Sequence, residues 1–144
     1  MLSVRERHRL LLDTNILLDV MDKQRPQCEE AREVLTRCNG GGDIGLVSPS
    51  SLNDAYYILR RLRGEEMARR IIDQLIELVV IVPMSAEECL ITVRSDEPDF
   101  EDGLIRACAE LNEVDFILTR DAAAFKRSRV RSMTCREYLD LFPE

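Results

Sequence analysis

The sequence predicts an α/β protein with a central parallel sheet of four to five strands and helices on both faces. Short apolar runs alternate along the chain with longer segments in which apolar residues recur at helical spacing. The first run, residues 9–13, is apolar almost throughout, which suits a strand covered on both faces. Alternating strands and helices favour parallel pairing, and in such sheets ligands bind at the carboxyl ends of the strands.

Length and composition indicate one domain over residues 1–144, with residues 1–8 as a polar N-terminal extension. A hydrophobic content of 45% and a charged content of 33% are typical of an ordinary globular protein. No apolar run reaches the roughly 18 residues that a membrane span needs. The start of the chain is a poor signal peptide because Asp13 and Asn15 interrupt its apolar run. We therefore expect a cytoplasmic protein without membrane contact.

After the first strand, residues that favour the start or the end of a helix divide the chain into segments. Ser48 followed by Pro49 is an N-cap with proline at the first helical position, and Gly64 ends that helix. Ser85 and Glu88 match a capping box. Together with the apolar periodicity, these signals predict helices over residues 14–22, 26–38, 49–63, 65–78, 85–94, 99–112, 122–125 and from 134 onward, and strands over residues 43–47, 79–82, 115–119 and 130–133, the last at an edge.

Helical spacing also predicts which apolar side chains face the core. Leu62 lies on the apolar face of the helix that ends at Gly64, and Met67 and Ile76 lie on that of the next helix. Leu141 belongs to the apolar face of the closing helix. All four side chains are expected to point inward.

Cysteine and histidine usage limits the chemistry. The five cysteines are odd in number and no two form a CxxC pair, which indicates reduced, mostly packed thiols. The only histidine, His8, precedes the first strand. Histidine-based catalysis and histidine-bound zinc are therefore disfavoured, and any metal ion is expected to have oxygen ligands, as magnesium and manganese do.

The net charge of −7 is unusual for a protein that binds nucleic acid, since phosphate contacts usually need a basic face. Local charge matters more than the total, however, and three basic clusters exist. The first and the third of these clusters are candidates for contact with a phosphate backbone, although a solvated helix face is the commoner explanation for each residue. The clusters are Arg60, Arg61 and Arg63; Arg69 and Arg70; and Lys126, Arg127, Arg129 and Arg131.

Four aspartates stand at strand ends or helix starts. Asp13 ends the first predicted strand and Asp121 follows the strand over residues 115–119. Asp54 and Asp102 lie in the first turns of their helices. In a parallel sheet all four positions share the carboxyl edge. For Asp54, Asp102 or Asp121 alone, favourable placement at a helix N-terminus is a sufficient explanation. A charge at the tip of an apolar strand, as at Asp13, has no role in packing.

Several carboxylates at one edge repel one another, and a divalent cation is the obvious compensation. Mg²⁺ or Mn²⁺ would prefer such oxygen ligands and would retain several waters. One of these waters, with its pKa lowered, is a nucleophile suited to in-line attack on a phosphodiester. The four aspartates are therefore candidate metal ligands and catalytic residues.

The chain resembles the PIN domain family, which includes the VapC-type toxin ribonucleases of bacterial toxin–antitoxin pairs. Four segments carry the resemblance, and they span nearly the whole chain. They are LLLDTNILLD at residues 10–19, SPSSLNDAYYILRR at 48–61, DFEDGLIRACAE at 99–110 and ILTRDAAAF at 117–125.

The resemblance implies a PIN-like α/β fold and a magnesium- or manganese-dependent endoribonuclease. Asp13, Asp102 and Asp121 match the first, third and fourth acids of the family, with Asp99 and Glu101 as alternatives to Asp102. Asp54 stands where the family usually has a glutamate, so the geometry of that ligand differs by one methylene. Residues matching the polar positions that support the acids are Thr14, Asn15 and Thr119.

The resemblance further implies RNA as the substrate, a small antitoxin as a partner and a homodimer as a possible assembly. A second hypothesis is a catalytically weak PIN-like module that binds RNA or protein without cutting, which the aspartate at position 54 and the acidic net charge motivate. A third class, phosphotransfer or receiver domains, also places aspartates at strand ends. The sequence has neither the paired acids on the first strand nor the Asp-x-Asp pattern typical of those proteins.

Overall fold

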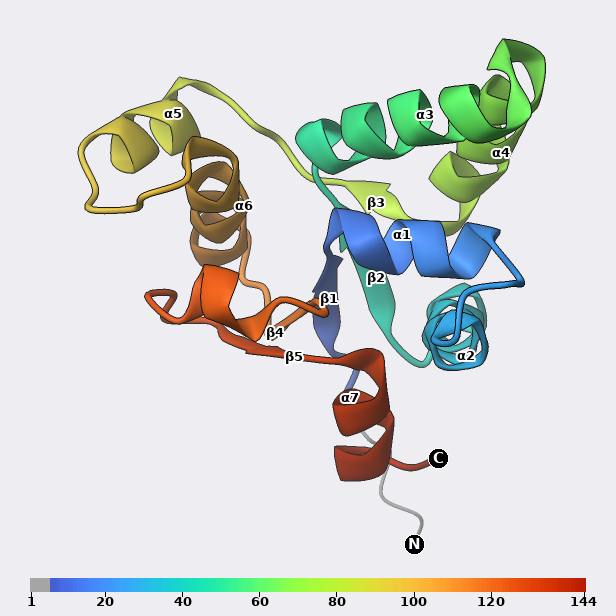
Figure 1. Cartoon of the computed structure of the whole chain (residues 1–144). Helices are drawn as coiled ribbons and strands as arrows, with labels where there is room; N and C mark the ends of the chain where they lie inside the picture. Colours follow the sequence, from blue (N-terminus) through green and yellow to red (C-terminus); the bar gives the residue numbers. More distant parts are fainter. Residues whose placement is uncertain (1–5) are drawn as a thin grey trace, which may run out of the picture.

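The computed structural model describes residues 6–144, in which five parallel strands form one sheet with the order β3-β2-β1-β4-β5 (Figure 1). The central position of β1 puts its carboxyl end between those of β2 and β4. The prediction of a parallel sheet with four to five strands is confirmed. The strands are β1 (Arg9–Leu12), β2 (Ile44–Val47), β3 (Val80–Ile81), β4 (Phe116–Leu118) and β5 (Arg131–Met133).

The helices follow the predicted order. No helix within residues 6–144 is long and apolar enough to cross a membrane. The segment over residues 122–125 is a single 3₁₀ turn, η1. The α-helices are α1 (Thr14–Met21), α2 (Cys28–Asn39), α3 (Pro49–Arg63), α4 (Glu65–Leu78), α5 (Ala86–Val93), α6 (Phe100–Leu111) and α7 (Cys135–Leu141).

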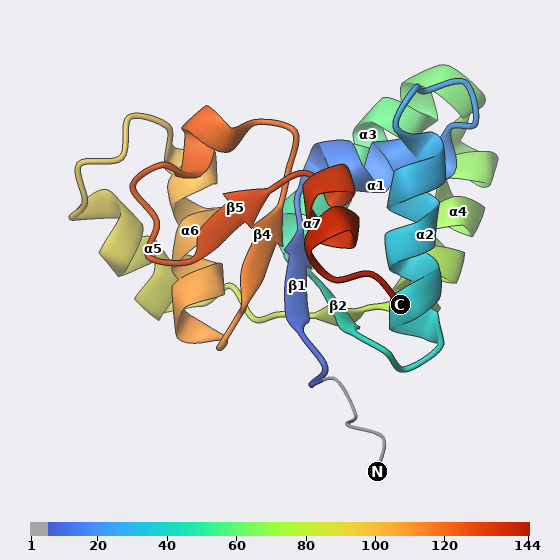
Figure 2. The same ribbon diagram turned by 90° about the horizontal axis from the view of Figure 1, so that it is seen from below.

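Side-chain alternation along β1 divides the core into two layers. Leu10 and Leu12 point to the layer covered by α1, α2, α3, α4 and α7. Leu11 points to the other layer, where it lies in one row with Leu46 and Ile117 under α6. Figure 2 shows the same arrangement, with α7 in front of the sheet and α6 behind it. Because both faces are covered, β1 contains only apolar residues between Arg9 and Asp13.

β2 and β4 begin one residue later than predicted because the aspartate before each of them binds the backbone near the start of β1. The Asp115 carboxylate accepts a 2.7 Å hydrogen bond from the Arg9 backbone N–H, so it closes the amino end of β1. The Asp43 carboxylate accepts one from the His8 backbone N–H at 3.2 Å. Thr119, predicted as a strand residue, follows β4 and turns toward the site described below.

Four side chains that were predicted to point into the core are exposed, so these predictions are wrong. Gly64, at φ 86°, reverses the chain between α3 and α4, which then pack mainly against each other. The sheet does not extend beneath the far ends of these helices or of α7, so their periodic apolar faces continue into solvent. The exposed side chains are Leu62 at 61%, Met67 at 41%, Ile76 at 44% and Leu141 at 50%.

Of the predicted polar extension, residues 1–5 lie outside the described residues. His8 packs among aromatic side chains, with its ring centroid 4.5 Å from that of Phe142. Its Nδ1 also lies 2.8 Å from the Tyr138 hydroxyl oxygen, which joins the start of β1 to α7.

The five cysteines are free thiols, as predicted. Burial raises the pKa of the thiols of Cys38, Cys108 and Cys135 to about 12. These three stay protonated at neutral pH and are therefore poor metal ligands and poor nucleophiles.

Candidate active site

Asp13 is the most buried of the four predicted acids, at 8% exposure. It directly follows β1 and is the N-cap of α1, where its Oδ1 accepts a 2.8 Å hydrogen bond from the Thr14 backbone N–H. Burial is the main cause that raises its pKa, and the charges of Asp121 and Asp54 raise it further. The sequence analysis found no local role for this charge, but the structure shows that it also begins a helix.

Thr119 connects Asp13 to Asp121. Its hydroxyl donates a 2.8 Å hydrogen bond to Asp13 Oδ2, and its Oγ1 accepts one of 3.0 Å from the Asp121 backbone N–H. The hydrogen bond to Asp13 lowers the pKa of that carboxyl and so partly opposes the effect of burial. Asp121 itself caps η1 through a 3.3 Å hydrogen bond from the Ala124 backbone N–H. The ends of β1 and β4 are thus held together by side chains.

Asp102 and Asp99 have different roles at the start of α6. Asp99 is the N-cap, and its Oδ1 accepts a 3.0 Å hydrogen bond from the Asp102 backbone N–H. The pKa of Asp102 is raised to about 6, first by burial and then by the charges of Asp99, Asp13 and Asp121. Asp102 is therefore an electrostatic neighbour of the two strand-end acids, whereas Asp99 is engaged in capping.

Glu101 forms a pair with Asp54 across the gap between α6 and α3. A hydrogen bond with the Asp54 carboxyl is the main cause that raises the pKa of Glu101 to about 7, followed by burial and by the charge of Asp54. Two carboxyl groups can share a hydrogen bond only when one of them carries a proton. Glu101 was only an alternative to Asp102 in the sequence analysis, and the structure assigns it a separate place beside Asp54.

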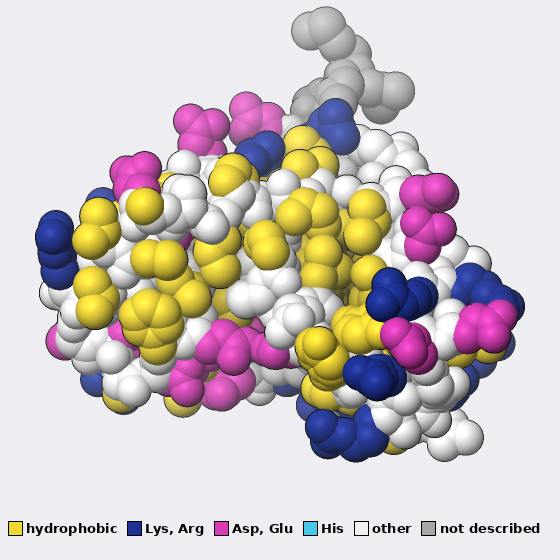
Figure 3. Space-filling model, turned by 90° about the horizontal axis from the view of Figure 1, so that it is seen from above, with side chains coloured by type: hydrophobic (Ala, Val, Ile, Leu, Met, Phe, Trp, Pro, Cys, Tyr) yellow, Lys and Arg dark blue, Asp and Glu magenta, His cyan; other side chains and the backbone are white. Residues whose placement is uncertain are grey.

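Acidic side chains also gather on the surface of the molecule near these elements. Figure 3 shows Asp and Glu side chains gathered at the lower centre of the molecule, between apolar side chains on the α5–α6 side and Lys and Arg side chains on the α3–α4 side. Asp54 and Asp121 raise the pKa of Asp13, and Asp13 and Asp121 raise that of Asp102, so the four predicted aspartates lie within electrostatic reach of one another.

The donor set suits a hard divalent cation, although the side chains do not form a preassembled cage. Among residues 6–144, no three His, Cys, Asp or Glu side chains are grouped closely enough to hold a metal ion as they stand. Mg²⁺ does not require such a cage, because it is usually bound by one or two carboxylates and keeps several waters. The neighbouring carboxylates raise the pKa values of Asp13 and Asp102, so these oxygen donors have no cation among residues 6–144 to offset their charge, which fits an ion of this kind.

The two remaining predicted supporting residues differ in their contacts. Asn15 Oδ1 accepts a 3.2 Å hydrogen bond from the Arg120 backbone N–H, which ties α1 to the segment between β4 and η1. Thr14 contributes its backbone N–H to Asp13, while its hydroxyl makes no hydrogen bond within the described part of the chain.

An ion pair beside the acids was not predicted. Asp19 has no exposed side-chain surface, and Arg120 binds it through Nε at 2.8 Å and a second nitrogen at 3.2 Å. Arg25 contributes a further contact at 3.4 Å. The sequence signal for this pair was Asp19, an acid within the otherwise apolar helix of LLLDTNILLD. No local pattern pointed to its partner, because Arg120 lies 101 residues further along the chain.

The predicted basic clusters lie partly in ion pairs. Arg69 and Arg70 bind Glu65 and Glu66 one turn away on α4, at 3.3 and 2.9 Å. Such exposed pairs belong to a solvated helix face. Arg60, Arg61 and Arg63 occupy the last turn of α3, where positive charge is favourable at a helix C-terminus.

Comparison with known proteins relates this geometry to a family. Residues 9–123 match the family model described as PIN domain. Among curated proteins, no sequence matches the chain at a significant level.

Three solved structures are similar in fold. VapC20 of Mycobacterium tuberculosis, described as a toxin that cleaves the sarcin–ricin loop, is 16% identical, with 80% of this chain and 92% of that chain covered and a TM-score of 0.65. DNA-bound VapBC from Salmonella typhimurium is 15% identical (89% and 98% covered, TM-score 0.68). A toxin–antitoxin complex from Klebsiella pneumoniae is 21% identical (88% and 97% covered, TM-score 0.66).

At these identities the structural matches show the fold, and the family model shows membership. Its match extends from β1 into η1 and so includes all four predicted aspartates, from Asp13 to Asp121. The chain belongs to the PIN domain family.

Proposed function

We propose that the chain is a metal-dependent endoribonuclease and the toxin component of a toxin–antitoxin pair. The observation that carries the proposal is the meeting of Asp13, Asp54, Asp102 and Asp121 at one edge of a PIN-family sheet, where their charges act on one another. The substrate class is RNA and the ion is Mg²⁺ or Mn²⁺.

In this proposal each acid has a distinct part. Asp13 is held in a fixed orientation by the Thr14 N–H and the Thr119 hydroxyl, so it is the ligand with least freedom. Asp102 at the start of α6 and Asp121 after β4 interact electrostatically with it and would complete the oxygen donors. Asp54 is available once its proton-sharing contact with Glu101 opens. A bound divalent cation supplies charge neutralisation and an activated water for attack on phosphorus.

The proposed protein partner is based on the solved structures with a similar fold. Several of these are toxins in complex with their antitoxins. We therefore include a small antitoxin protein as a partner and a homodimer as the assembly. The carboxyl edge of the sheet, with Asp13, Asp54, Asp102 and Asp121, is called the acidic edge below. A basic segment of an antitoxin could cover it and so block RNA from the site.

Asp13→Asn is the sharpest test of the mechanism. Asparagine is as good an N-cap as aspartate, so α1 keeps its start while the site loses its central charge. Purified wild-type protein should cleave single-stranded RNA with Mg²⁺ or Mn²⁺ and stop on addition of EDTA. The variant should melt near the wild-type temperature and cleave nothing. Asp140→Asn, which removes an exposed carboxylate of α7, is the matched control and should cleave normally.

A second candidate is a PIN-like module that binds RNA or protein without efficient cleavage. Two observations favour it: no three acids of residues 6–144 converge to hold an ion, and Asp54 pairs with Glu101. Gel-shift and cleavage assays on several unrelated RNAs separate the two candidates. Tight binding with no metal-dependent product would support the second, and metal-dependent cleavage of any of the RNAs would remove it.

The toxin assignment has its own test. Induced expression in a bacterial host should arrest growth with the wild-type chain and not with Asp13→Asn. Co-expression of the small reading frame adjacent to the gene should restore growth. Normal growth with soluble, cleavage-competent wild-type protein would contradict the toxin role while leaving the ribonuclease proposal intact.

A further inference from the structure

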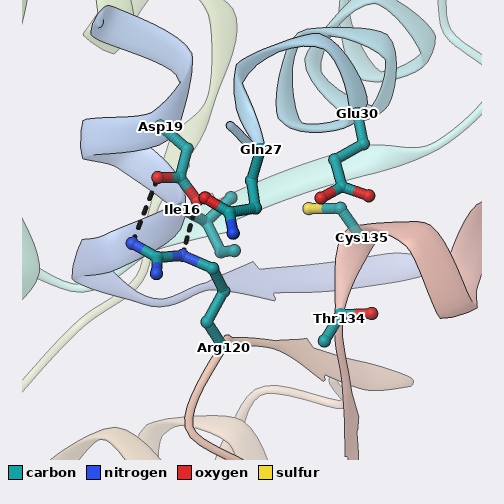
Figure 4. A pocket seen from close by; sticks show the side chains of 7 residues that line it. All are labelled: Ile16, Asp19, Gln27, Glu30, Arg120, Thr134 and Cys135. Carbon is teal, nitrogen blue, oxygen red and sulfur yellow. Dashed lines mark hydrogen bonds and ion pairs between the residues drawn. The ribbon is translucent and has the colours of Figure 1, made fainter. Parts of the chain in front are cut away.

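A cavity of about 330 Å³ lies beside the acidic edge, between α1, the start of α2, the end of β4 and the start of α7 (Figure 4). Its polar lining comes from four separate segments of the chain. These polar residues are Asp19, Gln27, Glu30, Arg120 and Thr134. The cavity is large enough for a planar heterocycle with part of its sugar, and it opens next to Arg120, the residue that precedes Asp121.

The Arg120 side chain presents a fixed planar group to this cavity. Its two hydrogen bonds to the fully buried Asp19 hold the guanidinium in one orientation, yet one third of the side chain remains exposed. A guanidinium plane is a surface on which RNA bases stack. Since the Arg120 backbone is also bound by Asn15, the plane is rigid relative to the site acids.

Charge around the cavity differs from that of the acidic edge. Asp19 is bound by Arg25 and Arg120, and Glu30 is bound by Arg136 at 3.3 Å. Arg25 and Arg136 also pair with Asp22 and Asp140, each at 3.8 Å, so three guanidinium groups offset four carboxylates around this cavity. Because these carboxylates are held in ion pairs, this side repels an approaching anion less than the acidic edge does.

Gln27 supplies unused hydrogen-bonding groups. It occupies the N-cap of α2 without a side-chain cap bond, and its amide makes no hydrogen bond within residues 6–144. Figure 4 shows this amide directed into the space between Arg120 and Glu30. An amide offers both donors and an acceptor, which is the combination that reads a base edge.

The remaining walls are chemically inert. Ile16 is apolar and buried, and burial raises the pKa of the Cys135 thiol to about 12. A protonated thiol is neither a nucleophile nor a good metal ligand, so these walls supply no reactive group.

We propose that this cavity binds the base of an RNA nucleotide next to the scissile phosphate, with Arg120 as the stacking surface and Gln27 as the group that reads the base edge. The inference rests on the proposed ribonuclease function and adds a base preference to it. Any preference would then belong to one nucleotide position beside the cut.

The test compares Gln27→Ala with Gln24→Ala, an exposed glutamine in the same loop that does not line the cavity. Each protein is incubated with Mn²⁺ and a single-stranded RNA pool of random sequence, and the product ends are sequenced. Wild type and Gln24→Ala should share a base preference at one position beside the cut. Gln27→Ala should lose it, with cleavage at the preferred sequence reduced roughly 3- to 10-fold, as the loss of one hydrogen bond predicts. Arg120→Lys keeps the charge without the plane and should also weaken the preference.

A binding measurement keeps the inference testable if no RNA is cut. The Gln27 side-chain amide signals are followed by NMR during titration with the four nucleoside 5′-monophosphates and with ribose 5-phosphate. Base recognition predicts shifts with at least one nucleotide and none with ribose 5-phosphate. Equal shifts with both would indicate an anion site only, and no shift with any would overturn the inference. Cleavage with an unchanged preference in Gln27→Ala would also overturn it, while absence of wild-type cleavage alone would count against the proposed function.

Discussion

The Thr119 hydroxyl donates a 2.8 Å hydrogen bond to Asp13 Oδ2 and fixes the orientation of that carboxylate. Both residues are buried, at 1% and 8% exposure, so no water replaces this contact easily. The bond joins the ends of two neighbouring strands, and the Asp121 backbone N–H binds the same hydroxyl oxygen. A single side chain therefore sets the positions of two site acids.

Thr119→Val should lower metal affinity and cleavage while preserving the fold. Valine has nearly the same shape but cannot donate to Asp13, and loss of such a supporting hydrogen bond typically costs about 10- to 100-fold in metal affinity or activity. Mn²⁺ binding measured by electron paramagnetic resonance reports the effect without relying on catalysis. Thr119→Ser retains the hydroxyl and should stay within a few-fold of wild type. Equal loss in both variants would show that packing, and not the hydrogen bond, matters here.

Asp54→Asn should lower the pKa of Glu101 from about 7 toward its ordinary value. The hydrogen bond with the Asp54 carboxyl is the largest cause of that elevated pKa, and an asparagine amide would instead donate to the ionised Glu101. Titration of the Glu101 side-chain carboxyl carbon by NMR, in the presence of EDTA, measures the change. Asp73→Asn, on the exposed face of α4, should leave the titration unchanged. An unaltered Glu101 curve in Asp54→Asn would contradict the pairing.

The metal-free protein should lose stability as pH rises from about 5 to about 8. The pKa values of Glu101 and Asp102 are raised in the folded state to about 7 and about 6, so the folded protein binds these protons more tightly than the unfolded chain does. Their contribution is present below the unfolded pKa values and disappears as pH passes through the folded ones. The melting temperature in EDTA should therefore fall across this range, and Mg²⁺ should restore it most at the alkaline end.

The double variant Glu101→Gln, Asp102→Asn removes both titrating groups and is the control for this pH dependence. Between about pH 5 and about pH 8, its melting temperature should change less than that of the wild type. An equally steep dependence would mean that other groups are responsible.

Gly103→Ala should destabilise the contact between α5 and α6. A Cβ at this position would lie 2.5 Å from the Thr92 Cγ2 atom, so the buried Thr92 side chain or one of the two helices must shift. Overpacking of this kind costs about 1–3 kcal/mol in the free energy of unfolding, measured by urea denaturation. Thr92→Ser removes the obstructing methyl group and keeps the hydroxyl that donates to the Glu88 carbonyl. The double variant Gly103→Ala, Thr92→Ser should recover most of the loss, and failure to do so would place the strain elsewhere.

Local signals in the sequence were sufficient for the fold. The apolar run before Asp13, the Ser48–Pro49 start and the Ser85–Glu88 capping box act within a few residues, and each has its predicted place in the structure. Periodicity also indicated which side of each helix is apolar. It could not show where the sheet stops beneath a helix, and this is why Leu62 and Ile76 were wrongly placed in the core.

The contacts that organise the candidate site were less predictable. Strand ends and helix starts brought the four aspartates to one edge, because parallel topology alone determines that edge. The pairing of Glu101 with Asp54 and of Arg120 with Asp19 depends on side-chain geometry between distant segments. No local pattern encodes such a pairing, so only the folded structure shows it.

The separation of 106 residues between Asp13 and Thr119 has a consequence for biosynthesis. On the ribosome, β1 and α1 emerge first, and Thr119, directly after β4, is made 106 residues after Asp13. Until β4 has left the exit tunnel and paired with β1, Asp13 has no Thr119 to orient it and no Asp121 beside it. Nascent chains that have not yet reached β4, and chains terminated before it, therefore lack the contacts that join the two ends of the candidate site.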